Sequence, residues 1–131
     1  MITNPNVKIN LGLNVLRKRD DGFHDLETLF VPYMGISDTL EIVVGDDYSR
    51  TSSAIFGKYA PEMIAQGISE DGKLMITIAR KEGVDWDPLK DLTARAYQIL
   101  AEDYQLPPVK IFLEKTSPAG LKRRCRVNLR P

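Results

Sequence analysis

Residues 5–30 read PNVKINLGLNVLRKRDDGFHDLETLF. Apolar side chains occupy every second position from Val7 to Val15, and this alternation predicts a strand with one buried face. The positions between them include Lys8 and Asn10. A polar group on a buried surface needs a partner. The second face of this strand is therefore expected to be solvated or to line a binding site.

An Asp-Gly pair at 21–22 separates this strand from a second apolar pattern. Asp-Gly between two such runs is a strong hairpin signal. Phe23 and His24 follow the turn directly. We expect the hairpin to hold them close to residues 18–19, with Lys8 farther along the first strand. One face of the second strand is expected to carry Leu26, Thr28, Phe30 and Pro32.

Strand patterns recur through the rest of the chain. Apolar and β-branched residues predict strands at 39–44, 74–79 and 109–113. Residues 51–56 are interpreted as the strand that returns from 39–44, and residues 33–38 as a loop. In the last strand we expect one side to consist of Val109, Ile111 and Leu113.

Helical patterns lie between these strands. Pro61 suits the first turn of a short helix within the ambiguous segment 58–68. The clearest helix covers residues 87–104, with Asp87 as its cap and Pro88 in its first turn. Its apolar face is expected to consist of Leu89, Leu92, Ala96, Ile99 and Leu100. The order of elements predicts an α+β fold, a mostly antiparallel sheet with one main helix packed on it.

The composition, 43% hydrophobic and 27% charged, is that of one ordinary globular domain. A single cysteine, Cys125, excludes an intramolecular disulfide, and a single histidine excludes a multi-histidine metal site, so we expect no metal site. No stretch approaches the roughly 20 apolar residues that span a bilayer, and no secretory signal is visible. We therefore expect a cytoplasmic protein with no membrane partner.

Charge is distributed unevenly along the chain. Five cations and no acid lie in residues 122–131, so the preceding part is acidic although the formal net charge is zero. An acidic body suits nucleic acid poorly, and no nucleic-acid partner is expected. The basic run is interpreted as a solvated tail. One alternative function remains open, a non-catalytic binding module that contacts polyanions through this tail.

The motifs PNVKINLGLNV and RDDGFHDLETLF resemble the 4-diphosphocytidyl-2-C-methyl-D-erythritol kinase family, part of the galactokinase, homoserine kinase and mevalonate kinase (GHMP) superfamily. That family opens with a P-x-A-K-x-N-L-x-L-x-V strand and a D-G-[YF]-H-x-L turn. The resemblance covers most of residues 5–42, with weaker similarity at 89–100 and 109–118. It implies that residues 1–121 are the amino-terminal part of a GHMP-type kinase domain. The implied reaction is ATP- and Mg²⁺-dependent phosphorylation of a cytidine-diphosphate alcohol in non-mevalonate isoprenoid biosynthesis.

The resemblance also implies roles for particular residues. Lys8 would be catalytic, near the hydroxyl that receives phosphate. Asn10 would bind the substrate or hold Lys8, Phe23 would stack on cytosine, and His24 would recognise the cytosine edge. Another GHMP acceptor such as homoserine or mevalonate remains an alternative. Without the resemblance, Lys8 is interpreted as a solvated strand residue, Phe23 as closing the hairpin core, and His24 as a turn residue.

The resemblance ends where the family has its phosphate loop. That glycine-rich loop, of the type PxGAGLGGGS, follows the last strand and presents backbone N–H groups to ATP. Here residues 122–126 read KRRCR. We therefore expect a truncated or frame-shifted chain that lacks the phosphate loop and the catalytic aspartate. Such a chain is expected to bind no ATP tightly, to be inactive alone, and to self-associate through uncovered surface.

Overall fold

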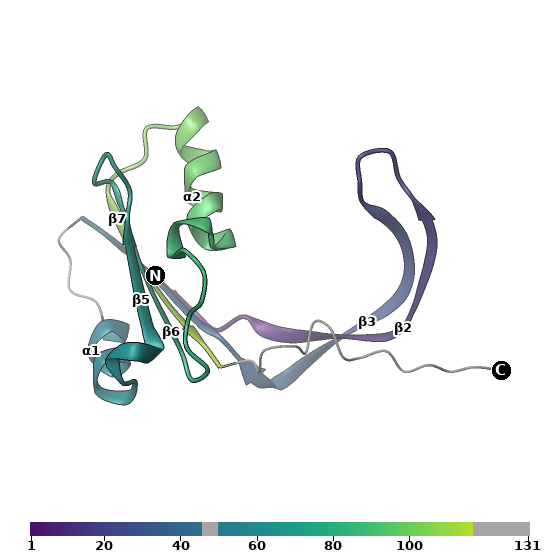
Figure 1. Cartoon of the computed structure of the whole chain (residues 1–131), viewed down its shortest axis with the longest axis horizontal. Coiled ribbons are helices and arrows are strands. Elements are labelled where there is room, and N and C mark those ends of the chain that lie inside the picture. The colour runs from purple at the N-terminus through teal and green to yellow at the C-terminus, as the bar shows by residue number, and fades with distance from the viewer. Residues whose placement is uncertain (46–49, 117–131) are drawn as a thin grey trace. The chain divides into compact units, whose positions relative to one another are not determined.

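The computed structural model describes residues 1–45 and 50–116. They form two compact units, one of Met1–Pro5 with Asp38–Thr116 and one of Asn6–Ser37 (Figure 1). The expected basic tail at 122–131, with Cys125, lies outside the described residues.

The first unit is built on a five-stranded sheet with the order β1-β4-β7-β6-β5. Its strands are β1 (Ile2–Thr3), β4 (Thr39–Val44), β5 (Ile64–Ile68), β6 (Leu74–Arg80) and β7 (Val109–Lys115). All neighbouring strands are antiparallel except β6 and β7, which are parallel. The α+β class and the strands expected at 39–44, 74–79 and 109–113 are confirmed.

The parallel strands β6 and β7 are joined by a crossover that contains the 3₁₀-helix η2 (Pro88–Lys90) and the helix α2 (Leu92–Asp103). The helix expected over 87–104 is therefore confirmed for residues 92–103, but it does not begin at Asp87. Asp91 has an extended backbone, with φ −64° and ψ 149°, and separates the two helices. Asp87 caps η2, and Asp91 caps α2 by accepting the Thr93 N–H at 3.1 Å.

Hydrophobic clusters cover both faces of the sheet, and Figure 1 shows one helix on each side. On the α2 face the cluster contains Leu74, Ile76, Ile78, Ala94, Val109, Ile111 and Leu113. This confirms the expected side of the last strand. On the other face it contains Val43, Ile55, Tyr59, Ala79 and Phe112.

Of the apolar face expected within residues 87–104, only Leu89 packs against the core as expected, and the other members are exposed. Leu92 is 73% exposed, and Ile99 and Leu100 are each more than half exposed. Ala94 is fully buried and Tyr97 packs beside it. The break at Asp91 is the reason, because the helical spacing that starts at Leu89 does not continue into α2.

Arg50–Lys58 forms helix α1 rather than the strand expected at 51–56. Ile55 and Tyr59 are four residues apart, and both are buried in the cluster on this face of the sheet. Residues at this spacing share one side of a helix. The carboxylate of buried Glu41 on β4 accepts the Thr51 N–H at 2.8 Å and so satisfies a donor at the helix start.

The short helix expected at Pro61 is confirmed as one 3₁₀ turn, η1 (Pro61–Met63). It ends there because Ile64 is extended, with φ −119° and ψ 134°, and begins β5. Backbone pairing of Ile64 with Ala79 of β6 fixes this boundary.

The second unit is the predicted hairpin, formed by β2 (Asn6–Lys18) and β3 (His24–Ser37). Gly22 has φ +85°, the left-handed region that glycine adopts freely, and its N–H donates to the Arg19 carbonyl at 3.1 Å. The loop expected at 33–38 is wrong, since β3 continues to Ser37, which pairs with Asn6.

The prediction that the first strand buries one face is also wrong. Leu11 and Val15 are each 54% exposed and Leu13 is 46% exposed. The alternation is present, but β2 and β3 form a sheet of two strands only. Such a sheet has no second layer of its own to bury either face.

The strand β2 contains extra residues relative to β3, which shift the pairing between Leu11 and Asn14 and again between Val15 and Arg17. Gly12, inside the first shift, has φ +70°. Bulges of this kind bend a hairpin and increase its twist. Figure 1 shows the hairpin curving along its length.

Candidate functional site

The pairing register assigns the hairpin side chains to two faces. Directly opposed residues of antiparallel strands share a face, and both register shifts described above add residues to β2. Alternate residues of β3 from His24 to Pro32 therefore stay on one face. Lys8 is opposite Pro32, Asn10 is opposite Phe30, and Lys18 is opposite His24. We call this surface the Lys8 face; it carries three of the four predicted site residues.

Near the start of β2, the Lys8 face combines a cation, an aromatic ring and an amide. The Lys8 ammonium lies 3.9 Å from the centre of the Phe30 ring, a cation–π contact. Phe30 is 50% exposed, and Asn10 is half-buried opposite it. The ring holds the ammonium at the surface, where its charge can meet an anionic ligand. Sequence reasoning placed Phe30 on the correct face of its strand but gave it no role.

At the turn, the Phe23 ring is 71% exposed, so it does not close a hairpin core. Its backbone is fixed, because the Phe23 N–H donates to Asp21 Oδ1 at 3.0 Å. Arg19 forms an ion pair with the same carboxylate, and Arg17 pairs with Asp25 at 2.8 Å. An exposed ring on an ordered turn is available for stacking. His24 beside it is exposed and is opposite Lys18, as expected.

The predicted site residues thus form two clusters on one hairpin. Lys8 and Asn10 lie near the start of β2, whereas Phe23 and His24 lie at the turn. At about 3.3 Å per residue, the path along β2 from Lys8 to Lys18 is on the order of 30 Å. The bend of the hairpin lies between the two clusters.

In the first unit, the end of β7 is fixed by an ion pair with the start of α2. Lys115 Nζ lies 2.7 Å from Asp91 Oδ2, and Asp91 is 7% exposed. Burial raises the pKa of the Asp91 carboxyl, but the Lys115 ammonium and the Thr93 N–H outweigh it, so this pKa lies below its ordinary value. The Trp86 ring contacts two cations, with its centre 5.0 Å from Lys115 Nζ and 5.7 Å from Arg80 Cζ.

A second polar group joins α1 to β7. Tyr59 Oη donates to Glu114 Oε1 at 2.8 Å, and the Lys58 ammonium pairs with the same oxygen. Burial raises the pKa of the Glu114 carboxyl, but its two partners outweigh burial and lower it overall. Burial and the bond to Glu114 raise the pKa of the Tyr59 hydroxyl. These contacts secure the sheet; sequence patterns gave no signal for them.

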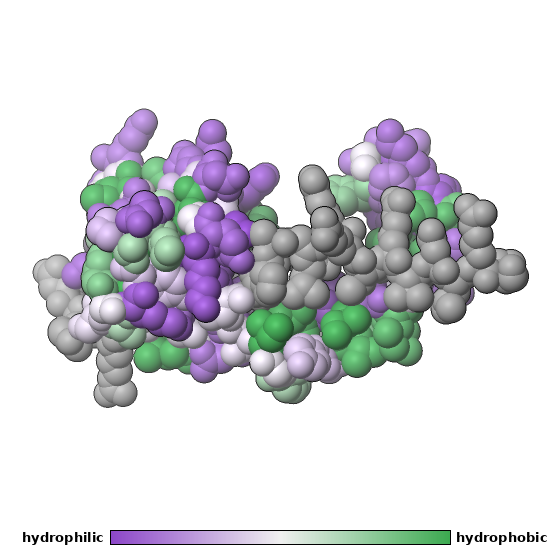
Figure 2. Space-filling view, turned by 60° about the horizontal axis from the view of Figure 1, so that its bottom comes forward, coloured by the Kyte–Doolittle hydropathy of each residue, from purple (hydrophilic) through white to green (hydrophobic). Residues whose placement is uncertain are grey.

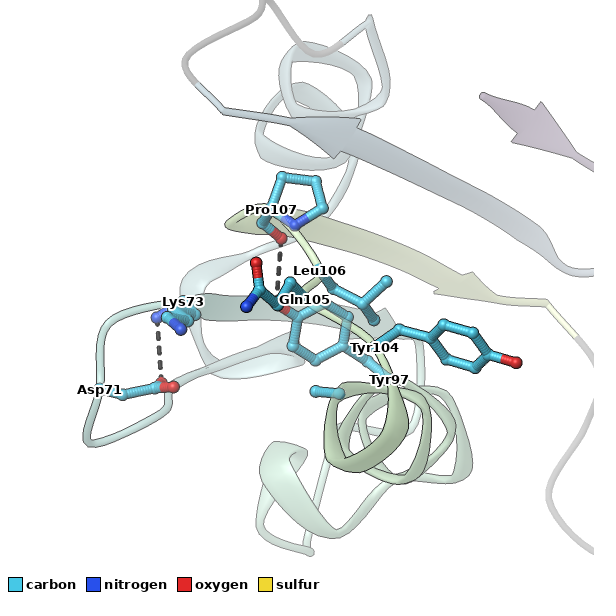
Figure 3. A pocket seen from close by; sticks show the side chains of 8 residues that line it. Asp71, Lys73, Tyr97, Tyr104, Gln105, Leu106 and Pro107 are labelled. Atoms are coloured by element: carbon cyan, nitrogen blue, oxygen red, sulfur yellow. Dashed lines mark hydrogen bonds between the residues drawn. The ribbon is translucent and has the colours of Figure 1, made fainter.

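A hollow in the first unit lies between the Asp71 turn and the end of α2 (Figure 3). Its polar groups form hydrogen bonds within the surrounding chain: Tyr97 Oη donates to the Pro107 carbonyl at 3.0 Å, and Asp71 Oδ1 accepts the Lys73 N–H at 3.1 Å. This hollow was not predicted, and we assign it no chemistry.

The described ranges, 1–45 and 50–116, hold neither a metal cluster nor a helix that could span a membrane. Within them, no three His, Cys, Asp or Glu residues are grouped to hold a metal ion. No helix in that part of the chain is long and apolar enough to cross a membrane.

Comparisons with known proteins confirm the resemblance. No family model matches the chain. A 4-diphosphocytidyl-2-C-methyl-D-erythritol kinase of Porphyromonas gingivalis is 55% identical over 120 residues, which cover 92% of this chain and 34% of that protein. The kinase of the same name from Bacteroides fragilis is 38% identical over 92% of this chain and 35% of its own length. The chain therefore spans about a third of the length of the curated relatives that it matches.

A crystal structure titled 4-(cytidine 5'-diphospho)-2C-methyl-D-erythritol kinase is also similar, with a TM-score of 0.51 and 26% identity. The match covers 92% of this chain and 33% of that one. The α+β arrangement described above is thus shared with part of a kinase of this type.

Proposed function

We propose that this chain is the amino-terminal third of an ATP-dependent kinase that phosphorylates 4-diphosphocytidyl-2-C-methyl-D-erythritol. One observation carries the proposal: kinases of that name match 92% of the chain, at up to 55% identity. The strand and turn motifs of residues 5–30, which carry the sequence resemblance, form the hairpin that holds Lys8 and Phe23.

In this proposal Lys8 acts on the phosphoryl acceptor. Negative charge is spread over the transferred phosphoryl group in the transition state, and a fixed cation nearby lowers the barrier. The Lys8 ammonium is exposed and is held over the Phe30 ring, which supports such a role. Asn10, on the same face, would hydrogen-bond the substrate.

The turn would bind the cytidine. Phe23 supplies a ring for stacking, worth roughly 1–3 kcal/mol per base, and His24 supplies polar groups for the cytosine edge. Because the two clusters are on the order of 30 Å apart along β2, one substrate can touch both only where the bend shortens the direct path. The bulged region around Gly12 would then help to determine which substrates can bind.

ATP and Mg²⁺ would serve the complete kinase. Magnesium is usually held by one or two carboxylates together with substrate phosphates. The phosphates of ATP need the glycine-rich loop, and residues 117–131 lack that pattern; within the described ranges no three His, Cys, Asp or Glu residues are grouped to hold a metal ion. The residues of this chain therefore do not fit an ATP–Mg²⁺ site, and their proposed contribution is limited to the acceptor. On this basis the 131-residue chain alone would transfer no phosphate.

The proposal is tested by titrating the 131-residue chain with cytidine 5'-diphosphate and measuring the NMR shifts of hairpin residues. Phe23→Ala is expected to weaken binding by roughly 5- to 150-fold, the equivalent of 1–3 kcal/mol, whereas Phe23→Tyr keeps a ring and retains it. Phe56→Ala, an exposed phenylalanine of α1, is the matched control. Equal binding by wild type and Phe23→Ala, or preference for homoserine or mevalonate, would contradict the proposal.

A further inference from the structure

The bulge at Gly12 lies between the two clusters of predicted site residues, and one side chain of β3 bridges it. The pairing on either side leaves Thr28 opposite two residues of β2, Gly12 and Leu13. Gly12 has φ +70°, as in the bulge type whose first residue is a glycine in the left-handed region. The Thr28 hydroxyl donates to the Gly12 carbonyl at 2.5 Å. A contact within one side chain therefore ties the bulged strand to its partner.

Thr28 is one of the alternate β3 residues that lie on the Lys8 face, and its side chain is half-buried. A bulge disrupts the ladder of backbone hydrogen bonds between two strands. The Thr28 hydroxyl supplies a hydrogen bond across this disruption. Valine has nearly the same shape as threonine but no hydroxyl, so it could fill the same space without making this bond.

Local contacts determine the shape of this hairpin, because a sheet of two strands is at best marginally stable alone. Between the bulge and the turn, the other face is tied by Asn14 with Glu27 at 3.3 Å and by Arg17 with Asp25 at 2.8 Å. Figure 2 shows hydrophilic residues around the turn and hydrophobic residues along the strands. The Thr28 bond lies where these two parts of the hairpin meet.

We infer that Thr28 is a positioning residue of the proposed acceptor site: by tying the bulge, it fixes the separation of the two clusters and so favours a ligand long enough to reach both. This inference rests on the proposed function, in which the cytidine lies at the turn and the alcohol end lies near Lys8. Cytidine 5'-diphosphate is the shorter ligand, because it lacks the methylerythritol group. Thr28 therefore acts on the difference in affinity between the two ligands.

The size of the effect follows from one hydrogen bond. The apparent affinity of a ligand falls with the fraction of molecules that are already in the binding-competent shape. Loss of the Thr28 bond should weaken binding of 4-diphosphocytidyl-2-C-methyl-D-erythritol by roughly 2- to 12-fold, the equivalent of about 0.5–1.5 kcal/mol for one such bond. Binding of cytidine 5'-diphosphate, which needs only the turn, should be unchanged.

Calorimetric titration of the 131-residue chain with each ligand tests the inference. Thr28→Val is expected to weaken the longer ligand only, whereas Thr28→Ser keeps a hydroxyl and should bind both ligands like the wild type. Thr39→Val is the matched control, since its hydroxyl bonds Asn4 Oδ1 at 3.1 Å in the first unit. In a Lys8→Ala background the far contact is already lost, so Thr28→Val should have no further effect.

A second measurement needs no ligand. Residual dipolar couplings of the free chain give the orientation of residues 6–11 and 29–37 relative to residues 14–18 and 24–27. Thr28→Val is expected to change this orientation, and Thr28→Ser is not. An unchanged orientation in Thr28→Val would overturn the inference. Equal weakening of both ligands would also overturn it, because a general loss of hairpin structure predicts that result.

The same data separate the inference from the proposed function. If neither ligand binds but Thr28→Val changes the orientation, the proposed function is contradicted and the role of Thr28 in the bend is supported. If both ligands bind through Phe23 and Thr28→Val leaves their affinities unchanged, the inference alone is contradicted.

Discussion

Replacing Asp91 should measure how far one carboxylate secures the crossover between β6 and β7. Its side chain caps α2 through the Thr93 N–H and binds the Lys115 ammonium at 2.7 Å, in a site only 7% exposed. Loss of a helix cap costs typically about 1 kcal/mol. A hydrogen bond to a charged group contributes about 1.5–3 kcal/mol. Asp91→Ala is therefore expected to lower the free energy of unfolding by about 3 kcal/mol, and Asp91→Asn, which keeps the cap, by about 2 kcal/mol.

The assay is urea unfolding followed by fluorescence of Trp86, the chain's single tryptophan. Its ring centre lies 5.0 Å from Lys115 Nζ, so its emission reports on the first unit where the ion pair lies. A double-mutant cycle with Lys115→Met separates the ion pair from the cap. Equal midpoints for Asp91→Ala and Asp91→Asn would refute a capping role, and a coupling energy near zero would refute the ion pair.

The pH dependence has a definite sign. The pKa of the Asp91 carboxyl is lower in the folded chain than its unfolded value of about 3.9. Its contribution to stability is therefore fully present above the unfolded pKa and is lost as pH falls through the folded pKa. The stability difference between wild type and Asp91→Asn should stay constant near neutral pH and shrink below about pH 4. A difference that grows on acidification would contradict the reasoning.

Other perturbations test the hairpin, the second polar group and the proposed inactivity. Gly12→Ala should destabilise the hairpin by roughly 1–2 kcal/mol, because Gly12 has φ +70°, a backbone conformation that is strained for alanine. The loss would be seen as faster amide exchange. An added Cβ meets no atom at Gly12 or at Gly57 of α1, so Gly57→Ala is the matched control and should not destabilise the chain. Tyr59→Phe should cost about 1 kcal/mol through loss of the bond to Glu114, and an unchanged urea midpoint would count against that bond. The purified 131-residue chain should transfer no phosphate from ATP to 4-diphosphocytidyl-2-C-methyl-D-erythritol; turnover that Lys8→Ala abolishes would disprove this.

Local signals predicted the elements that local chemistry determines. Alternating apolar residues and Asp-Gly predicted the hairpin, and β-branched runs predicted β4, β6 and β7. The same reasoning failed at α1, whose sequence has no strong helical pattern. That helix forms where Ile55 and Tyr59 pack on the sheet and Glu41, distant in sequence, satisfies its first turn. Tertiary contacts override weak propensity in such segments.

The candidate site was predicted unevenly for a related reason. Side-chain alternation is enough to assign Lys8 and Asn10 to one face, and the turn signal is enough to place Phe23 and His24 together. Bulges are not visible in alternation, so the register shifts that put Val15 on the Lys8 face and Asn14 on the opposite face could not be predicted. Contacts between distant elements, such as Lys115 with Asp91, had no sequence signal either.

The exposed apolar alternation in β2 connects the fold to the proposed function. A strand pattern predicts that a face is compatible with burial, while the burial itself depends on what packs against it. In this hairpin Leu11 and Leu29 remain exposed on one face, and the opposite face holds Lys8 over Phe30. Burial of Leu11 and Leu29 therefore does not follow from the pattern, whereas the contact of Lys8 with Phe30 follows from the pairing of β2 with β3 alone.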